Sequence, residues 1–308
     1  MALSIKDGIA PAFGRHETFT IRYGWLKRGF DEAMVDPMVF YASDVHHRLG
    51  VGKNMAKSIR HWLVVTGLAD RPGGIRGPLQ ITQLGELIWN EDPYFLASGS
   101  WWAIHIQLIN QPRAGAWCWY FNQFGQPRFE RAVCIERLNQ YLQLHRRRAP
   151  SRNTLERDIA CLLRCYASTV PPKREDPEDG NDCGLRELGL LYHFPGSGVY
   201  QRVTEPKAVP PELIGYNIAL NRLEAQGSEG TVDLPIESLA REPGGPGPAF
   251  QVSAENLYEL LQRAERTRRD FKIAGLGAER VLRIPRRAPL EWLERYYAGL
   301  KEAQADAA

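Results

Sequence analysis

Two adjacent side chains near the N-terminus are of the types that phosphodiester hydrolysis uses. His16 and Glu17 stand together in the segment GRHETF, between the cations Arg15 and Arg22. A metal-dependent hydrolase needs carboxylate oxygens for a divalent ion, often a histidine as general base, and cations near the developing negative charge. We therefore take His16 and Glu17 as candidate catalytic residues and Glu17 as the candidate metal ligand. A helix cap or an ion pair is the alternative interpretation of this pair.

A second group of the same residue types occupies residues 44–47. Asp44, His46 and His47 fall within one turn of a helix that is expected to precede a basic helix. Asp44 is accordingly a further candidate catalytic carboxylate. The residue types suit hydrolysis, and only their arrangement in space decides whether they act together.

Familiar catalytic and cofactor-binding motifs are missing from the sequence. The segment LGVGKN fails as a phosphate-binding loop because His47 and Asn54 stand where a glycine and a serine or threonine are needed. The nucleophile-elbow, His-Glu-x-x-His, paired Cys-x-x-Cys and spaced Asp…Glu-x-Lys patterns are also absent. We therefore expect no nucleotide, no haem and no structural zinc, and a prediction of nuclease activity cannot rest on these motifs.

The cysteines are too few and too scattered for a disulfide framework. Three thiols together with His193 could hold zinc or an iron–sulfur cluster, but closely spaced ligand pairs are missing. Cys161 and Cys165 share an apolar helix face with Leu162 and Tyr166, which favours buried small hydrophobic residues. The five cysteines are Cys118, Cys134, Cys161, Cys165 and Cys183.

The elements that would position the candidate site lie between residues 40 and 90. The run FYASDVHHRL predicts a helix, Gly50–Gly52 a short turn, and KNMAKSIRHWLVVTGL a second helix. One face of the second helix is predicted to be buried, because apolar residues recur at intervals of three and four. That face consists of Val51, Met55, Ile59, Trp62 or Leu63, and Thr66.

A hairpin and a capped helix are predicted to follow. The segment ADRPGGIRGPLQIT predicts two short strands around a Pro/Gly turn that carries Arg71 and Arg76. Thr82 suits the N-cap of the helix QLGELIWN. With a further helix over residues 21–30, this order of elements predicts a winged helix-turn-helix.

The outward face of the basic helix consists of polar and cationic residues, which are Lys53, Asn54, Lys57, Arg60 and His61. Such a helix can enter a DNA groove while a basic hairpin contacts phosphate. The alternative is a packing unit with an ordinary solvated face. The combination of basic helix, glycine turn, basic hairpin and capped helix favours nucleic-acid binding.

Composition is that of a globular protein, with 308 residues, 44% hydrophobic and 24% charged. No apolar stretch approaches the ~20 residues that a membrane span needs, and the N-terminal segment lacks the layout of a signal peptide. We expect a cytoplasmic protein with no membrane partner.

Residues 1–150 hold 18 Lys and Arg against 12 Asp and Glu, whereas the remainder holds 21 against 24. The basic half is the one with the winged-helix pattern, as polyanion binding requires.

The predicted fold class is mainly α with minor β. We expect a winged-helix domain over residues 1–92, an aromatic-rich helical middle domain over 93–170, and a mostly helical domain over 171–308. The last can contain a second, smaller helix-turn-helix-like unit. Aromatic residues crowd residues 92–125, and their helical spacing with isoleucines favours a core over a base-stacking surface. Asn153 and Glu156 have the spacing of a capping box.

Several blocks of the sequence resemble a bacterial family of SspB-like proteins, a domain-of-unknown-function family found in DNA phosphorothioation and phage-defence gene clusters. The blocks include FGRHETFTIRYGWLKRGF, LGVGKNMAKSIRHWLVVTGL and ITQLGELIWNEDPYFLASGSWWAIH, and the resemblance covers roughly residues 13–260. The resemblance implies a protein that binds double-stranded DNA and nicks one strand with Mg²⁺ or Mn²⁺. It also implies an SspA-like cysteine desulfurase, an SspC-like ATPase and an SspD-like sulfurtransferase as partners.

The resemblance carries over a set of motif residues, which are Arg15, His16, Glu17, Arg22, Lys27, Lys53, Asn54, Ser58 and Arg60. The cations among them would contact phosphate or base edges. Arg28, Lys57, His61, Arg71 and Arg76 complete the predicted DNA-binding set. Two alternatives remain at this point, namely a non-catalytic DNA-binding adaptor that recruits sulfur-transfer enzymes, and a winged-helix regulator.

Overall fold

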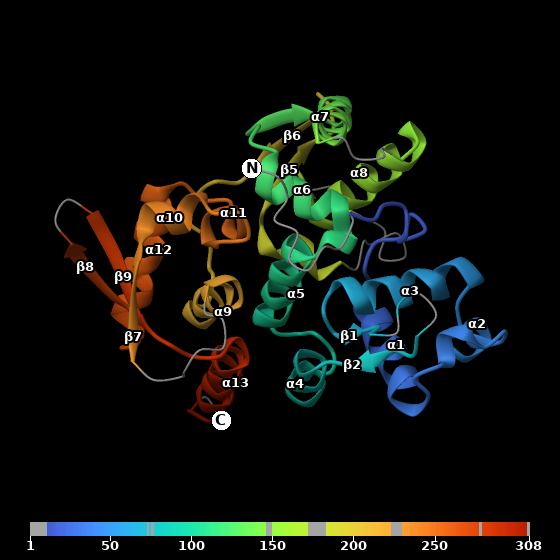
Figure 1. Cartoon of the computed structure of the whole chain (residues 1–308), viewed down its shortest axis with the longest axis horizontal. Helices are drawn as coiled ribbons and strands as arrows, with labels where there is room; N and C mark the ends of the chain where they lie inside the picture. Colours follow the sequence, from blue (N-terminus) through green and yellow to red (C-terminus); the bar gives the residue numbers. More distant parts are fainter. Residues whose placement is uncertain are drawn as a thin grey trace. The chain divides into compact units, whose positions relative to one another are not determined.

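The chain folds into two compact units, residues 1–203 and residues 204–308 (Figure 1). The computed structural model describes residues 11–72, 74, 77–145, 150–171, 183–222, 230–276 and 279–306. Both units are mainly helical with short strands, which confirms the predicted fold class. The predicted three-domain division, with boundaries after residues 92 and 170, stays a prediction. Within the described residues, every helix is too short or too polar to cross a lipid bilayer.

The first unit begins with a group of helices and one small hairpin. They are α1 (Tyr23–Val35), α2 (Val45–Arg48), α3 (Lys53–Val65), β1 (Ala69–Asp70), β2 (Gln80–Ile81) and α4 (Gln83–Glu91). β1 and β2 are antiparallel, with Ala69 opposite Ile81. The Thr82 hydroxyl accepts a hydrogen bond from the Gly85 amide at 3.0 Å and caps α4. The strands and the cap are therefore as the sequence predicts.

The predicted helix over residues 40–49 is wrong as a continuous element. A 3-10 helix spans Val39–Tyr41, and Ala42 is extended before the four-residue α2 begins. Ser43 and Asp44 stand at this break. Serine and aspartate side chains compete with the backbone for hydrogen bonds, so they favour turns and helix starts over helix interiors.

Helix α3 buries the face that the sequence predicts. Ile59, Trp62, Leu63 and Thr66 are buried, and the Thr66 hydroxyl donates to the Trp62 carbonyl at 2.6 Å. Ser58, which the resemblance includes among the motif residues, is also fully buried. The buried stripe is wider than the strict spacing suggests, as is usual for a helix that packs on a globular core.

The rest of the first unit combines four longer helices with a sheet of order β3-β6-β5-β4. The helices are α5 (Ser98–Asn110), α6 (Gly115–Gln123), α7 (Arg131–Leu144) and α8 (Arg152–Tyr166), with 3-10 turns at Pro112–Ala114 and Gly184–Leu188. The strands are β3 (Arg128–Glu130), β4 (Ala167–Thr169), β5 (Leu191–Phe194) and β6 (Val199–Arg202). β4 and β5 are parallel, and the other neighbours are antiparallel.

Aromatic residues of α5 and α6 form the core of this unit, as their helical spacing predicts. Trp101, Trp102, Trp117, Trp119 and Tyr120 are each at most 3% exposed. The cysteines are buried free thiols, which confirms their predicted hydrophobic role. Helix α8 begins after Ser151, whose hydroxyl accepts from the Thr154 amide, so the capping box expected at residue 153 is wrong by two positions.

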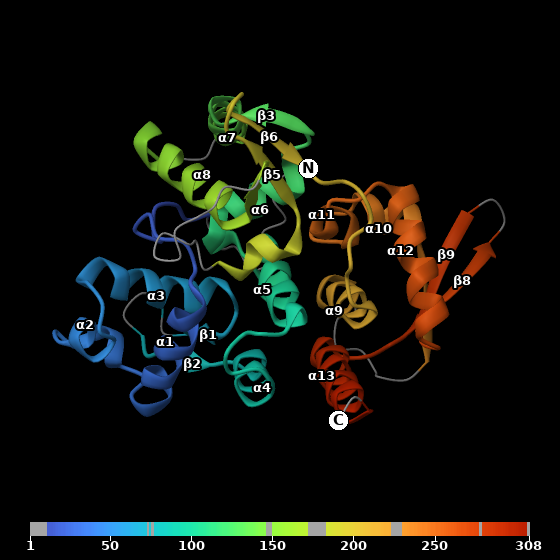
Figure 2. The same ribbon diagram turned by 180° about the vertical axis from the view of Figure 1, so that it is seen from behind.

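The second unit contains α9 (Pro211–Arg222), β7 (Thr231–Pro235), α10 (Ile236–Arg241), α11 (Pro246–Phe250), α12 (Ala254–Thr267), β8 (Lys272–Leu276), β9 (Glu279–Pro285) and α13 (Pro289–Asp306). Its antiparallel sheet has the order β7-β9-β8, and α10 and α12 pack against it (Figure 2). Helices α9 and α13 pack closely because Gly215 leaves room for the Trp292 ring. The helix-turn-helix-like unit expected in this region stays a prediction.

Candidate nucleic-acid interface

The loop of residues 13–20 lies between α3 and α8 and has an unusual backbone. Gly14, Glu17 and Thr18 all have positive φ angles, of 71°, 50° and 70°. Glycine tolerates this conformation, but each other residue in it costs roughly 1–2 kcal/mol. The packing around the loop must therefore hold Glu17 and Thr18 in place.

His16 ties this loop to α8. The imidazole is 1% exposed, and its Nε2 lies 3.0 Å from Oδ1 of Asp158. Its Nδ1 accepts a hydrogen bond from the Thr18 amide at 3.0 Å, so the ring proton belongs on Nε2, which donates to the carboxylate. Asp158 also accepts from the Gly14 amide at 2.8 Å. The ring packs against Trp62 and Trp117.

Unlike the buried His16, Glu17 is half-buried, and it lies where two cavities meet. It lines both the larger cavity beside α3 and a smaller one between α3 and α8. In the part of the chain that the structure describes, its carboxylate makes no ion pair. A carboxylate with neither a cation partner nor a cap is available to a metal ion or a ligand.

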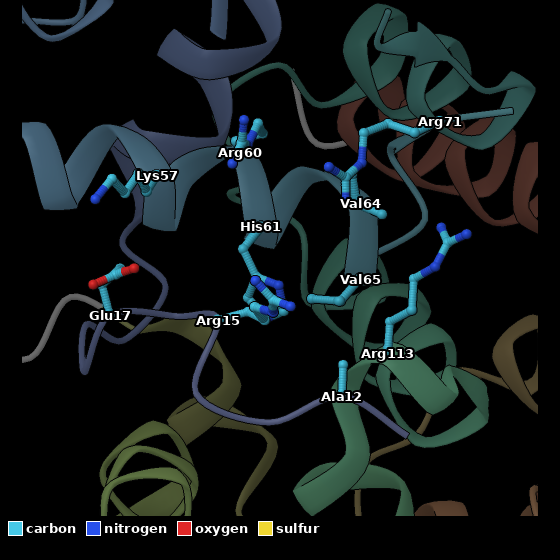
Figure 3. A pocket seen from close by; sticks show the side chains of 10 residues that line it. All are labelled: Ala12, Arg15, Glu17, Lys57, Arg60, His61, Val64, Val65, Arg71 and Arg113. Atoms are coloured by element: carbon cyan, nitrogen blue, oxygen red, sulfur yellow. The ribbon is translucent and has the colours of Figure 1, made fainter. Parts of the chain in front are cut away.

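The larger cavity, here called the basic cavity, has a volume of about 470 Å³. Among the described residues, its walls carry five cations, which are Arg15, Lys57, Arg60, Arg71 and Arg113, together with Ala12, Glu17, His61, Val64 and Val65. Figure 3 shows Glu17 and Lys57 at one end, Arg71 and Arg113 at the other, and Arg15 beside His61 between them. One carboxylate among five cations suits an anionic ligand with several charges.

The arginine side chains that line this cavity repel one another electrostatically. Burial lowers the pKa of the Arg60 guanidinium, and the charges of Arg71 and Arg15 lower it further, while Tyr41 acts in the opposite direction. The guanidinium nevertheless stays protonated, since arginine does not lose its proton in proteins. A bound phosphate would relieve this repulsion and accept hydrogen bonds in the planar geometry that arginine favours.

His61 stays uncharged beside these cations. Burial lowers its pKa to about 3, and His16 and the charges of Arg71, Arg15 and Arg60 act in the same direction. At neutral pH the side chain is therefore a neutral imidazole. It adds hydrogen-bonding capacity and a flat ring to the cavity without adding charge.

The free energy of unfolding is expected to decrease as the pH falls from 6.5 toward 3, in part because of His61. The unfolded chain takes up a proton at the ordinary pKa of 6.5, whereas the folded chain does so only near 3. Replacing His61 with glutamine should reduce the acid-side slope by up to about 1.4 kcal/mol per pH unit. Urea unfolding of both proteins at a series of pH values measures this difference, and identical slopes would contradict it.

The smaller cavity, here called the flanking cavity, has a volume of about 340 Å³ and lies on the other side of Glu17. It is lined by Gly14, His16, Glu17, Thr18, Asn54, Thr154 and Arg157. Arg157 and Arg113 are absent from the residues expected from the sequence. Neither belongs to a motif or to the basic helix, so no local signal could have found them.

Comparison with known proteins agrees with the resemblance found in the sequence. The family model described as "Protein of unknown function (DUF4007)" matches residues 13–297. The chain belongs to this family. It is similar to an SspB crystal structure with 25% identity and a TM-score of 0.78, and to a magnesium ion-bound SspB crystal structure with 26% identity and a TM-score of 0.79. Each covers 93% of this chain and 88% of the other. No curated protein matches the chain.

The structure of this DUF4007 protein brings many of the predicted site residues together. Arg15, Glu17, Lys57, Arg60, His61 and Arg71 all line the basic cavity, and Asn54 lines the flanking one. Lys53 is exposed at the first residue of α3. Arg76 lies outside the described residues. The predicted cluster is therefore largely present, and its catalytic and DNA-binding roles remain predictions.

Other predicted residues lie elsewhere. Ser58 is buried on the core side of α3, and Asp44 lines neither cavity. Lys27 pairs with Asp31 at 2.9 Å, and the Arg28 guanidinium donates to the Leu49 carbonyl at 2.8 Å. Arg22 is exposed over the Trp25 ring. The DNA-binding roles predicted for these three cations remain predictions.

Whether this DUF4007 protein can hold the expected divalent metal ion depends on the side chains that could ligate it. Among the described residues, no group of three His, Cys, Asp or Glu side chains could hold an ion. Magnesium, however, is commonly held by one or two carboxylates together with substrate phosphates. The unpaired Glu17 carboxylate beside cavities lined by cations fits that second arrangement, in which a substrate phosphate completes the coordination.

Proposed function

We propose that this protein binds double-stranded DNA and nicks one strand as a component of a bacterial DNA phosphorothioation system. The observation that carries the proposal is the place of Glu17, a free carboxylate between a cavity with five cations and a second cavity with Arg157. The similarity to SspB over most of the chain supports the same assignment.

The proposed binding mode is that of a winged helix-turn-helix. Helix α3 would approach a groove with its exposed residues Lys53, Asn54 and Lys57, and the β1–β2 hairpin would follow the backbone. Arg60, Arg71 and Arg113 line the basic cavity, where they would contact phosphate oxygens. In this binding mode, the DNA strand that runs from the basic cavity to the flanking cavity would pass over the Glu17 carboxylate.

In the proposed chemistry, the residues that line the cavities bind the metal ion and stabilise the negative charge of the phosphate. Glu17 would hold a Mg²⁺ or Mn²⁺ ion together with a DNA phosphate, and a bound ion would supply Lewis-acid stabilisation of the phosphoryl oxygens. Arg60 and Arg71 would stabilise the negative charge that develops on the phosphate. His16 uses one ring nitrogen for Asp158 and the other for the Thr18 amide, so we propose a positioning role for it in place of general base.

The proposed partners follow from the phosphorothioation assignment. An opened backbone would be a substrate for sulfur insertion, which requires an SspA-like cysteine desulfurase, an SspC-like ATPase and an SspD-like sulfurtransferase. A second candidate function is a non-catalytic DNA-binding adaptor for these enzymes. The lack of a three-ligand metal group among the described residues favours that alternative.

A supercoiled-plasmid assay tests the proposal. Purified protein is incubated with plasmid and Mg²⁺, Mn²⁺ or EDTA, alone and with the partner proteins. Conversion to open circles that requires a divalent ion supports the nickase, whereas a gel shift without nicking under all these conditions supports the adaptor. If neither nicking nor a gel shift is observed, the proposed function is wrong.

Replacing Arg157 with alanine is expected to weaken DNA binding about equally for all sequences. Arg157 faces the flanking cavity, where a phosphate contact would be independent of the base. Losing one such contact reduces the salt dependence of the affinity by about one unit in slope. Fluorescence anisotropy at several salt concentrations measures both effects. Arg152→Ala is the matched control, because Arg152 is exposed on the same helix and pairs with Glu156; equal effects of the two changes would refute a specific role.

A further inference from the structure

We infer that Asp158 is a positioning residue for Glu17 and acts on it through His16. This inference rests on the proposed function, because it assigns Asp158 a role in the same nicking site. Asp158 lies on α8, 142 residues from His16 in sequence, and is 2% exposed. It lines neither cavity, so any effect on the reaction must pass through the loop that it holds.

The contacts form one continuous chain from α8 to the carboxylate. Oδ1 of Asp158 accepts from Nε2 of His16 at 3.0 Å and from the Gly14 amide at 2.8 Å. Nδ1 of His16 in turn accepts a hydrogen bond from the Thr18 amide at 3.0 Å. Glu17 stands between His16, whose side chain these bonds fix, and Thr18, whose backbone amide they fix. The loop is therefore held on both sides of Glu17.

This chain of contacts depends on which ring nitrogen carries the proton. Nδ1 can accept from the Thr18 amide only if the proton is on Nε2, and the Asp158 oxygen favours that tautomer because it accepts the Nε2 proton. Without an acceptor at position 158, the proton is free to move to Nδ1, and the Thr18 amide loses its partner. Glu17 and Thr18 would then leave their positive φ angles, which are unfavourable without support.

Asp158 differs in this respect from a residue that merely supports the fold. A fold-supporting residue would affect DNA affinity, turnover and thermal stability together. A positioning residue for Glu17 affects mainly the turnover rate, because most of the cations that bind DNA stay in place. Of the five described cations that line the basic cavity, Arg15 lies in the loop, whereas Lys57, Arg60, Arg71 and Arg113 belong to other elements.

Two substitutions separate the roles of the hydrogen bonds and of the charge. Asp158→Ala removes the acceptor and should lower kcat about 10²-fold, the scale that displacement of a reacting group by about 1 Å produces. The Kd for plasmid DNA should change by no more than about 3-fold, since phosphate contacts set the affinity and four of the five described cavity cations lie outside the loop. Asp158→Asn keeps an oxygen that accepts from both donors and should retain kcat within about 3-fold.

Hydrogen exchange of the Thr18 amide, read from peptides that cover residues 15–21, provides a measurement that needs no activity. We expect protection in the wild type and in Asp158→Asn, and loss of protection in Asp158→Ala. An unprotected Thr18 amide in the wild type would overturn the inference, even if Asp158→Ala fails to fold. So would wild-type kcat in a folded Asp158→Ala protein. If the wild type does not nick DNA, the proposed function fails, and the exchange pattern alone decides whether Asp158 fixes the loop.

Discussion

Replacing Glu17 with glutamine is expected to lower the nicking rate by about 10³-fold, because a lost metal ligand costs several kcal/mol and each ~1.4 kcal/mol is tenfold in rate. Glutamine has nearly the same shape, but it lacks the charge that would hold a divalent ion. DNA binding should persist and become slightly tighter, since Glu17 is a carboxylate that lines the basic cavity and repels phosphate. Opposite changes in affinity and rate would distinguish Glu17 from a residue that binds DNA.

Plasmid nicking at saturating protein gives the rate, and fluorescence anisotropy in EDTA gives the affinity. Glu86→Gln is the matched control, because it removes one exposed carboxylate from α4 of the same unit. A Glu17→Gln protein that nicks as fast as the control would remove Glu17 from the mechanism. The adaptor interpretation predicts a different pattern, in which neither change affects the integrity of the DNA.

Replacing Arg60 and Arg71 together with glutamine is expected to have the largest effect on DNA affinity. Each lost contact should cost about 1–3 kcal/mol if it reads a base, and a phosphate contact should reduce the salt slope by about one. Arg60 is half-buried, and burial together with the charges of Arg71 and Arg15 lowers its pKa, so these cations are desolvated and close to one another. Desolvated guanidinium groups bind phosphate more strongly than fully hydrated ones.

Anisotropy with two DNA sequences at several salt concentrations separates the two kinds of contact. A loss that is equal for both sequences indicates phosphate, whereas a loss of preference between them indicates base reading. Arg131→Gln together with Arg137→Gln controls for the loss of two charges, since both residues are exposed on α7 and line neither cavity. If the double replacement binds DNA as tightly as this control, the DNA does not enter the basic cavity.

Local signals in the sequence were sufficient for α3, the β1–β2 hairpin and the start of α4. The spacing of Ile59, Trp62 and Thr66 located the buried face of α3, and Thr82 located the start of α4. These predictions succeed because helix periodicity and capping depend on residues within one or two turns of each other. The predicted helix over residues 40–49 failed where Ala42 interrupts it, since the competition between turn and helix there depends on packing as well as on sequence.

The composition of the site was predicted only in part. Residues of α3 and of the GRHETF segment were found because they are adjacent in sequence and share a type of chemistry. The prediction could not tell that Ser58 faces the core, that Lys27 pairs with Asp31, or that Arg28 donates to the Leu49 carbonyl. A pattern of polar residues marks the side of a helix, but neighbouring elements decide which of those residues remain exposed.

By itself, the sequence determined that this protein is mainly helical, has an aromatic core, and carries cations on one helix. Only the tertiary structure decided that Arg113, Arg157 and Asp158 belong to the same region. His16 looked like a catalytic base from its neighbours in sequence, yet folding buries it against Asp158, 142 residues away. Contacts over such separations depend on how helices pack, and packing leaves no periodic or local pattern in the sequence from which they could be inferred.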